Sequence, residues 1–385
     1  MLRIGLLIDS LIGGGAERVV LNFAGGLAKL GHDVHIILVK NEQQHQTSDV
    51  PFTIHHLSEN GVLAESRWRN KQLLSEKLQA TVTRIESDGK KFNFFTSNAE
   101  DMDRLSKMAK LDPVFIRYRN SMVKYIETKV GNKTGLKKII RQFRWIQKFR
   151  SIYSNRHIVT VSNALQGELV NQVGVKPKSL TTIYNPFDFD LLRSKAAEPI
   201  DPALKPQEPY IIYAAKFENR KRQDLLLKAY AKANISQKLV LIGGTYTASD
   251  ERWYKQMMEL IKELGIEDKV ILPGFQNNPY AWVKGADLFV MSSDSEGLPT
   301  VLIESLIVGT PVISTNCPTG PSEILIDEFS TFLSPTDDVA GLATNIRKAL
   351  ESYPEITDAY LEKFSINNSL SQYIRHYENQ SAGNN

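Results

Sequence analysis

The stretch that decides the fold reads Glu296-Gly-Leu-Pro-Thr-Val-Leu-Ile-Glu304, and it places two carboxylates on either side of a loop-to-helix junction. It follows an apolar run of strand length, Asp287-Leu-Phe-Val-Met291, and a short turn rich in serine. Pro299 suits the first turn of a helix, and Gly309 is typical of a helix end. The pattern predicts a strand, a loop and a helix in succession. The first glutamate then lies at the carboxyl end of the strand, and the second about two turns into the helix.

This junction has the features of a binding site for a polar ligand. In an open α/β sheet, ligands bind at the carboxyl edge of the strands. Glu296 and Glu304 can accept hydrogen bonds from the hydroxyls of a polyol, although two isolated glutamates are more simply explained by the helix dipole and a solvated face. Main-chain N–H groups at the helix start are expected to form an anion or hydroxyl site, at Gly297, Leu298, Pro299 and Thr300.

Length and composition indicate a globular protein of two domains. The chain has 385 residues, of which 42% are hydrophobic and 23% charged. No apolar run reaches the roughly 18 residues of a membrane-spanning helix, and the first strand leads into Gly13-Gly-Gly15 rather than a signal-peptide cleavage site. We therefore expect a cytoplasmic protein. The single cysteine, Cys317, excludes an internal disulfide and a cysteine-built metal cluster.

Charge is distributed unevenly along the chain. Residues 1–190 contain 28 Lys and Arg against 18 Asp and Glu, a net +10, whereas the remainder has 19 against 25, a net −6. Between Lys133 and Arg150, apolar residues recur at helical spacing beside basic ones. Such a basic amphipathic helix either lies on an anionic membrane surface or packs on a sheet with its charges in water, and the sequence leaves both open.

The order of apolar and amphipathic stretches predicts two Rossmann-like domains with parallel sheets that face a central cleft. Strand-length apolar runs alternate with helical stretches, stop at a polar segment that carries three prolines, and then resume. We expect a first domain over residues 1–187, a linker over 188–208, a second domain over 209–362, and a final helix with a disordered tail over 363–385.

Two lysines follow the strand expected at Tyr210–Ala215. Lys216 and Lys221 can hold a diphosphate and stabilise the negative charge that builds on it when a group leaves, which removes the need for a metal ion. Arg220 or Arg222 can share this role. A solvated basic loop is the alternative interpretation.

Glycines mark three further strand ends. Gly14 and Gly15 follow the first strand, Gly243 follows the strand near 239–242, and Gly274 with Phe275 follows the strand near 270–272. Glycine lets a ligand approach the main chain closely, or simply permits a tight turn. The first of these turns lacks the third glycine of the dinucleotide fingerprint, which argues against a nicotinamide dehydrogenase.

Together these motifs resemble the retaining glycosyltransferases of family four, which have the GT-B fold. The resemblance rests on the stretch 296–304 and on sequences at both ends of the first half and through most of the second. These include Gly13-Gly-Gly-Ala-Glu-Arg18, Gly31-His-Asp-Val34, Val161-Ser-Asn163, Ile183-Tyr-Asn-Pro186, Ala215-Lys-Phe217, Leu226-Leu-Lys-Ala229, Gly309-Thr-Pro-Val-Ile313 and Gly320-Pro-Ser-Glu-Ile324. The region 41–147 matches poorly, and acceptor choice is expected to lie there.

The resemblance implies that the final helix crosses back to the first domain, and it also implies roles for individual residues. Glu304 is expected on the ribose hydroxyls, Glu296 and the N–H groups through Thr300 on the transferred sugar, and Lys216 and Lys221 on the diphosphate. Two positions depart from the family pattern. Lys216 stands where the family usually has arginine. Arg119 stands where it usually has a histidine, so the catalytic role of that histidine does not carry over directly, and Arg119 is the candidate catalytic residue at this position.

The sequence therefore predicts a metal-independent glycosyltransferase without a cofactor. The resemblance implies a UDP-hexose or UDP-N-acetylhexosamine donor, retention at the anomeric carbon, and a surface-glycan or lipid-linked oligosaccharide acceptor at the inner face of the membrane. The alternatives are a nucleotide-sugar epimerase or sugar phosphorylase of the same fold, and a non-catalytic basic membrane-binding module. No nucleic-acid motif is recognisable.

Overall fold

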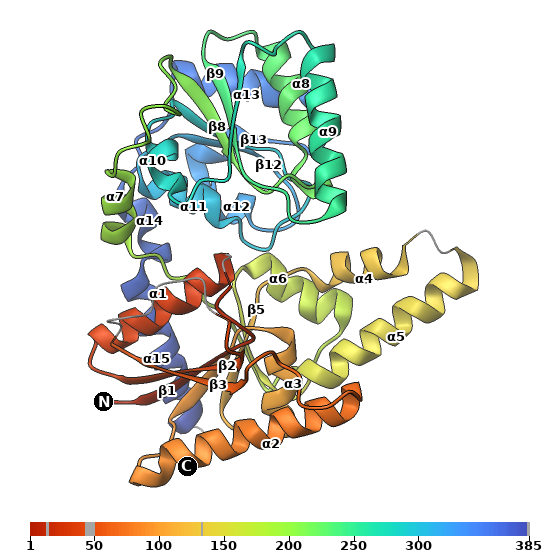
Figure 1. The fold of residues 1–385 in the computed structure, drawn as a ribbon, viewed down its shortest axis with the longest axis vertical. Helices are drawn as coiled ribbons and strands as arrows, with labels where there is room; N and C mark the ends of the chain where they lie inside the picture. The colour runs from red at the N-terminus through yellow and green to blue at the C-terminus, as the bar shows by residue number, and fades with distance from the viewer. Residues whose placement is uncertain (13–14, 43–50, 132–133, 383–385) are drawn as a thin grey trace. The chain divides into compact units, whose positions relative to one another are not determined.

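The computed structural model describes residues 1–12, 15–42, 51–131 and 134–382. The chain forms two compact units (Figure 1). Unit 1 consists of Met1–Pro186 together with Ile366–Asn385, and unit 2 consists of Phe187–Ser365. The last segment of the chain therefore belongs to the same unit as the first.

In its described residues, unit 1 is built on a seven-stranded sheet whose neighbouring strands are all parallel. The spatial order is β3-β2-β1-β4-β5-β6-β7. β1 is buried along its whole length, as expected for a central strand covered on both faces. The strands are β1 (Arg3–Ile8), β2 (Asp33–Lys40), β3 (Thr53–Ser58), β4 (Phe94–Ser97), β5 (Val114–Tyr118), β6 (His157–Thr160) and β7 (Ser179–Thr182).

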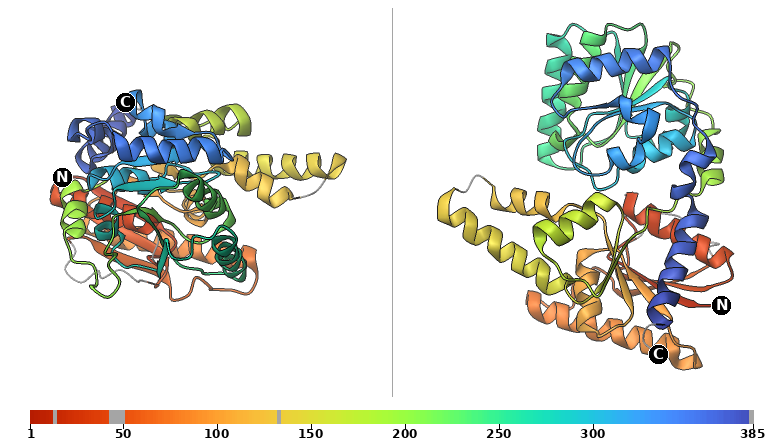
Figure 2. Two further views of the ribbon diagram at one scale, coloured as in Figure 1. Left: turned by 90° about the horizontal axis from the view of Figure 1, so that it is seen from above. Right: turned by 180° about the vertical axis from the view of Figure 1, so that it is seen from behind.

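Helices cover this sheet, and one hairpin of helices extends away from it. α4 and α5 form the hairpin, which Figures 1 and 2 show reaching well beyond the sheet. The helices of unit 1 are α1 (Gly15–Lys29), α2 (Arg67–Ile85), α3 (Glu100–Met108), α4 (Met122–Val130), α5 (Gly135–Tyr153), α6 (Asn163–Gly167) and α15 (Ile366–Ala382), with short helical turns at Glu86–Asp88 and Glu168–Val173.

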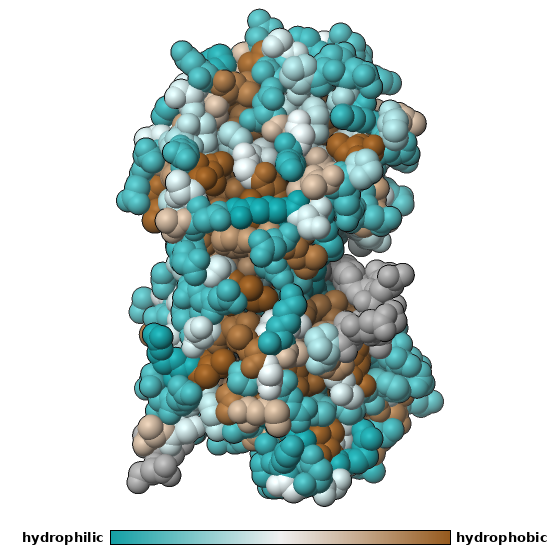
Figure 3. Space-filling view, turned by 90° about the vertical axis from the view of Figure 1, so that its left-hand side faces the viewer, coloured by the Kyte–Doolittle hydropathy of each residue, from teal (hydrophilic) through white to brown (hydrophobic). Residues whose placement is uncertain are grey.

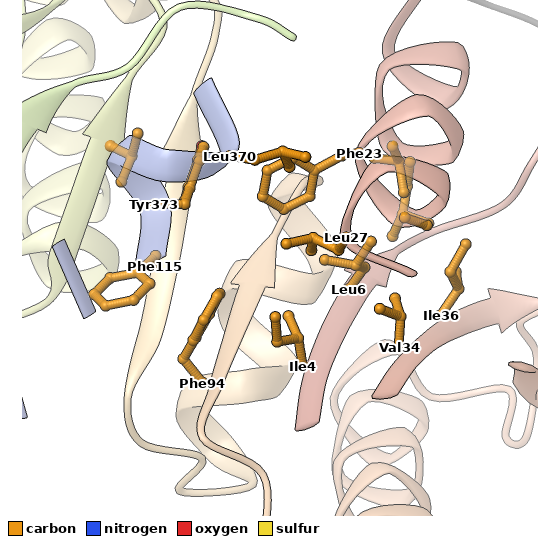
Figure 4. Packing of buried hydrophobic residues seen from close by; sticks show 14 of the residues in the cluster. Ile4, Leu6, Phe23, Leu27, Val34, Ile36, Phe94, Phe115, Leu370 and Tyr373 are labelled. Atoms are coloured by element: carbon orange, nitrogen blue, oxygen red, sulfur yellow. The ribbon is translucent and has the colours of Figure 1, made fainter. Parts of the chain in front are cut away.

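The final helix α15 completes the hydrophobic core of unit 1. Figure 4 shows Leu370 and Tyr373 of α15 facing Phe23 of α1, beside strand residues such as Phe94. The rings of Phe23 and Tyr373 lie edge to face, with their centroids 4.7 Å apart. Gly26 lets the two helices approach, because a Cβ at this position would lie 2.7 Å from Ile366. α15 is thus held by close packing and not by a surface contact alone.

Unit 2, in the residues described, has a six-stranded parallel sheet with the order β10-β9-β8-β11-β12-β13. Its strands are β8 (Tyr210–Ala214), β9 (Lys238–Ile242), β10 (Val270–Gly274), β11 (Leu288–Met291), β12 (Val312–Thr315) and β13 (Leu333–Ser334). Its helices are α7 (Phe189–Ala196), α8 (Gln223–Ala233), α9 (Ala248–Glu263), α10 (Pro279–Lys284), α11 (Thr300–Ile307), α12 (Pro321–Ile324), α13 (Val339–Glu351) and α14 (Asp358–Leu361), with short turns at Asn219–Lys221, Asp327–Phe332 and Glu362–Phe364.

The expected linker begins with a helix. Within residues 188–208, α7 packs against α10 and α11, and the guanidinium of Arg193 donates to the carbonyl oxygen of Ile307 at 3.0 Å. Asp188 caps α7 by accepting from the N–H of Leu191. Only the proline-bearing remainder, residues 197–208, lacks helix and strand. Polar composition alone did not distinguish a capped surface helix from a linker.

No helix in the described part of the chain is long and apolar enough to cross a membrane. On the face of the molecule shown in Figure 3, hydrophobic residues appear in small groups among hydrophilic ones, as is usual for exposed protein surface. Cys317 is buried, and burial raises the pKa of its thiol to about 12. This cysteine is therefore a packing residue.

Candidate functional site

The candidate site of unit 2 lies where the strand order of its sheet reverses. β8 leads outward to β9 and β10 on one side, and β11 leads to β12 and β13 on the other. The crevice beside such a reversal, at the carboxyl ends of the strands, is where α/β sheets bind ligands. In unit 2 the loops that follow β8 and β11 at this position are 215–222 and 292–299, and they contain Lys216, Lys221 and Glu296.

Glu296 and Lys221 form an ion pair at this crevice. The Lys221 ammonium donates to one carboxylate oxygen of Glu296 at 2.7 Å, and the Arg220 guanidinium donates to the other at 3.1 Å. Only 11% of the Glu296 side chain is exposed, and burial alone would raise the pKa of its carboxyl group. The positive charges of Lys221 and Arg220 outweigh burial and lower this pKa, so Glu296 is ionised near neutral pH.

Lys216 belongs to a neighbouring group of charges. Its ammonium lies 3.0 Å from a carboxylate oxygen of Asp250 and 3.4 Å from one of Glu218. Burial acts to lower the pKa of Lys216, but these two carboxylates raise it overall. Glu218 also pairs with Arg220 at 2.7 Å. An unbroken chain of ion pairs thus joins Lys216 to Glu296, as cations and carboxylates alternate.

Arg222 has a different role from Arg220. Its main chain adopts a left-handed conformation, with φ of 49°, and its guanidinium donates to Asp224, Asp294 and Asp337. Its carbonyl oxygen also accepts from the Ser292 hydroxyl at 2.9 Å. Arg222 therefore ties the two loops together, whereas Arg220 is the arginine that reaches Glu296.

A second loop, residues 316–320, fixes the main chain around Glu296. The Glu296 N–H donates to the carbonyl oxygen of Pro318, and the Thr319 N–H and hydroxyl both donate to the carbonyl oxygen of Glu296. Gly320 packs so closely that a Cβ there would lie 2.9 Å from the carbonyl oxygen of Gly297. The Glu296 loop is therefore held in one conformation before any ligand binds.

The start of α11 differs in detail from the expected row of donors. Pro299 is the N-cap residue and has no N–H, so the expected site at Gly297, Leu298, Pro299 and Thr300 has donors at the other three positions only. Leu298 is buried. Glu304 lies in the second turn of α11, on the helix that begins at the crevice.

Glycine is needed at two of the predicted positions, 243 and 274, for different structural reasons. Gly243 lies against the loop after β8, and a Cβ there would come within 1.9 Å of the carbonyl oxygen of Ala215. The Gly243 N–H donates to the carbonyl oxygen of Gly274. Gly274 has a φ of 76°, and a Cβ at this position would meet no atom within 4 Å. Phe275, which follows, is 62% exposed. Gly243 thus permits close packing, and Gly274 permits a turn that presents an aromatic ring to solvent.

The remaining predicted residues lie in unit 1. Gly14 is outside the described residues, and Gly15 begins α1. Arg119 follows β5, and burial, followed by the charge of Arg117, lowers the pKa of its guanidinium despite the nearby carboxylates of Glu17, Asp103 and Asp9.

Sequence reasoning missed Asp250 and Glu218, the two partners of Lys216. Asp250 is visible in the sequence as the third residue of a capping box at the start of α9, where Thr247 and Asp250 bond to each other's main chain. Its second role, beside a lysine 34 positions earlier, depends on the tertiary fold.

Comparisons with known proteins identify the family. Residues 13–191 match the model of Glycosyltransferase Family 4, and residues 194–367 match the model of Glycosyl transferases group 1. The chain is a family-four glycosyltransferase. It is similar over 94% of its length, and 94% of the relative's, to the N-acetylgalactosamine-N,N'-diacetylbacillosaminyl-diphospho-undecaprenol 4-alpha-N-acetylgalactosaminyltransferase of Campylobacter jejuni, with 28% identity.

Two further comparisons extend this finding to a second relative and to the fold. The lipopolysaccharide 1,6-galactosyltransferase of Escherichia coli K12 is 27% identical over 49% of this chain and 51% of that protein. The solved structure of Anabaena HepE in complex with UDP and glucose aligns with a TM-score of 0.75 and 16% identity, covering 98% of this chain and all of that one. The glycosyltransferase has the GT-B fold of two Rossmann-like domains with parallel sheets.

Proposed function

We propose that this glycosyltransferase transfers a hexose or N-acetylhexosamine from a UDP-linked donor to a surface-glycan or lipid-linked oligosaccharide, with retention at the anomeric carbon. The Lys221–Glu296 ion pair at the strand reversal of unit 2 carries the proposal, because it combines a buried carboxylate with three cations in the loops beside it. The names of the Campylobacter and Escherichia coli relatives support the acceptor class, and the HepE complex with UDP supports the donor class.

Each residue of the crevice has a chemical task in this reaction. Glu304 accepts hydrogen bonds from the ribose hydroxyls, and Glu296 with the main-chain donors at the start of α11 binds the sugar that is transferred. Lys216 and Lys221, assisted by Arg220, balance the charge that develops on the leaving diphosphate. Because the Glu296 loop is already held by residues 318–320, little reorganisation is needed when the donor binds.

The transfer needs no protein nucleophile. The bond between the anomeric carbon and the diphosphate oxygen breaks as the acceptor oxygen attacks the same face, and the acceptor proton passes to the leaving phosphate. The side chains of the crevice then act by charge and orientation alone. Fixed cations supply the stabilisation that a metal ion would otherwise give.

Donor binding provides the direct test. A panel of nucleotide sugars is screened for thermal stabilisation, since a ligand at 100 times its dissociation constant adds about 2.7 kcal/mol. Glu304→Ala should then weaken UDP binding by roughly 1.5–3 kcal/mol, measured by calorimetry, because hydrogen bonds to a charged acceptor are lost. Unchanged UDP affinity in this variant would remove Glu304 from the site.

We also propose peripheral association with the inner face of the cell membrane. The N-terminal half of α5 is exposed and carries both basic and apolar side chains, including Leu136 at 71% and Phe143 at 59% exposure. Lys133, at the start of the predicted basic stretch, lies outside the described residues. A helix of this composition is suited to an anionic membrane surface, where a lipid-linked acceptor lies.

A further inference from the structure

The cations of the unit 2 crevice are paired by carboxylates of the protein itself. The Lys221 ammonium lies 2.7 Å from one carboxylate oxygen of Glu296, and the Arg220 guanidinium lies 3.1 Å from the other. The Lys216 ammonium lies 3.0 Å from a carboxylate oxygen of Asp250. Hydrogen bonds between charged groups are stronger than those between neutral groups. A diphosphate that binds these cations therefore competes with carboxylates that are already in place.

Glu218 differs from the other carboxylates of this group in what it contacts. Asp250 also caps α9, where its carboxylate accepts from the N–H of Thr247 at 2.9 Å. The Glu218 carboxylate instead bridges two cations, at 3.4 Å from the ammonium of Lys216 and 2.7 Å from the guanidinium of Arg220. Its side chain is 25% exposed, so solvent and a ligand can both reach it. The contacts of Glu218 are thus with two of the proposed diphosphate cations.

The main chain on both sides of Glu218 is fixed. The N–H of Phe217 donates to the carbonyl oxygen of Gly244 at 3.1 Å, and the N–H of Lys221 donates to the carbonyl oxygen of Glu218 at 2.9 Å. The Phe217 ring is buried and packs edge to face on Tyr254, with the ring centroids 4.9 Å apart. The Glu218 carboxylate can therefore leave the two cations mainly by rotation of its own side chain.

Charge decides which nucleotide these carboxylates oppose more strongly. The group contains equal numbers of positive and negative side chains, namely Lys216, Arg220 and Lys221 with Glu218, Asp250 and Glu296. The diphosphate of a UDP-sugar carries about two negative charges, and that of free UDP close to three, because its terminal phosphate ionises a second time with a pKa of about 6. Repulsion from a carboxylate grows with this charge. The product of sugar transfer is therefore opposed more strongly than the donor.

We propose that Glu218 is an internal competitor that promotes release of the nucleoside diphosphate after transfer. Its carboxylate takes Lys216 and Arg220 as the diphosphate leaves, and it yields them more readily to a nucleotide sugar than to the more highly charged product. This inference rests on the proposed function, which places the donor diphosphate at these cations. Product release limits turnover in many enzymes, so a residue that weakens product binding speeds the cycle.

Glu218→Gln tests this inference, because the amide keeps the shape of the side chain and removes its charge. Lys216 and Arg220 keep Asp250 and Glu296 as partners, so the variant should fold, which thermal unfolding checks. UDP should bind the variant at least fivefold more tightly than it binds wild type, measured by calorimetry. UDP-glucose and UDP-N-acetylglucosamine should gain a smaller factor. Uridine, which has no phosphate, should bind both proteins within twofold of each other.

Glu259→Gln is the matched control. Glu259 is an exposed residue of α9, nine positions after Asp250 and so about 13 Å further along the helix. The change removes the same charge from unit 2 at a distance from the crevice, and all affinities should stay within twofold of wild type. A purely structural role for Glu218 would make the Glu218→Gln protein bind UDP more weakly, which is the opposite sign.

The rate of UDP dissociation reports on release directly. Measured by surface plasmon resonance on the full chain, it should fall at least threefold in Glu218→Gln and stay unchanged in Glu259→Gln. The inference is overturned if wild type binds UDP and Glu218→Gln binds it no more tightly, if the UDP-sugars gain as much as UDP, if Glu259→Gln has the same effect, or if the dissociation rate does not fall. Wild type that binds no UDP would instead overturn the donor site of the proposed function, so the two failures are distinguishable.

Discussion

At the scale of single residues, tertiary pairing decides what each charged group can do. The sequence placed Glu296 and Lys221 at strand ends of one sheet, because both follow apolar runs of strand length. It could not show that they pair, since 75 positions separate them and the contact depends on the reversal of strand order between β8 and β11. The sequence likewise could not show that Arg220 contacts Glu296 whereas Arg222 ties the two loops together, because both contacts depend on the tertiary fold.

The cations of unit 2 lead to a prediction about metal ions. If Lys216 and Lys221 supply the charge stabilisation, transfer activity should survive EDTA. Changing both lysines to alanine should lower turnover by about 10²–10³ for each transition-state donor lost. Turnover is measured well below the melting temperature, because removing Lys221 leaves the largely buried Glu296 with Arg220 as its one remaining side-chain cation among the described residues. Loss of wild-type activity in EDTA, with recovery on adding Mg²⁺ or Mn²⁺, would contradict a metal-free reaction.

Asp9 gives a prediction about stability and pH. Its pKa is raised to about 6 in the folded chain, against about 3.9 for an unperturbed aspartate. The folded state therefore holds this proton more tightly, so the contribution of Asp9 to stability is full below about pH 4 and falls as pH rises to about 6. Asp101, Arg119 and Lys40 are the charged groups that face it.

Asp9→Asn should remove this dependence, because the amide keeps the shape and does not ionise. The variant should be more stable than wild type at pH 7, by on the order of 1–3 kcal/mol, and should show no gain at pH 4. Urea unfolding at the two pH values measures both. A gain of equal size at pH 4 and pH 7 would show that ionisation of Asp9 is not its cause.

At the scale of elements, the sequence predicted strands that carry a continuous apolar run better than strands that do not. The runs expected at 210–215, 239–242, 270–272 and 287–291 correspond to β8, β9, β10 and β11, with ends that differ by one or two residues. β4, β7 and β13 have no comparable signal. β7 reads Ser-Leu-Thr-Thr and is only half-buried at the sheet edge, and β13 spans two residues, so neither carries an apolar run. β4 reads Phe-Phe-Thr-Ser, which has only two apolar residues and no clear period.

Gly243, which follows β9, and Gly274, the last residue of β10, allow a matched comparison of two glycines. Gly243→Ala should cost several kcal/mol, because the new Cβ would overlap the carbonyl oxygen of Ala215 and push away the loop that carries Lys216. Gly274→Ala should cost only about 1–2 kcal/mol, because its strain comes from a positive φ in open space. Thermal unfolding and UDP affinity are measured for both. If the two variants change thermal stability and UDP affinity equally, the contact with Ala215 is unimportant.

At the scale of the whole molecule, the alternation of strand and helix signals in the sequence predicted the two Rossmann-like folds. It did not predict which polar side chains of unit 1 come together. Alternating strand and helix signals predict Rossmann-like domains wherever they recur. Two cavities of unit 1, one beside Asp9 and the other along α5, draw on α2, α3, α4 and α5, which lie in or near the region that matches the family poorly. Residues that converge from several helices leave no signature at fixed spacing, so only the fold brings them together.

The uneven charge of the chain predicts salt-sensitive binding to anionic membranes. The excess of positive charge in residues 1–190 and the exposed face of α5 should bind the protein to phosphatidylglycerol vesicles at low salt and release it at high salt. Each well-placed Lys or Arg contributes about 1 kcal/mol near such a surface, so changing Lys137, Lys138, Arg141 and Arg144 to Glu should abolish co-sedimentation.

Changing Leu136 and Phe143 to Ser should weaken binding at both salt concentrations, because the apolar contribution is not screened. UDP binding in unit 2 is the control and should be unchanged in both variants. Wild-type protein that ignores anionic vesicles at low salt would instead point to a soluble acceptor.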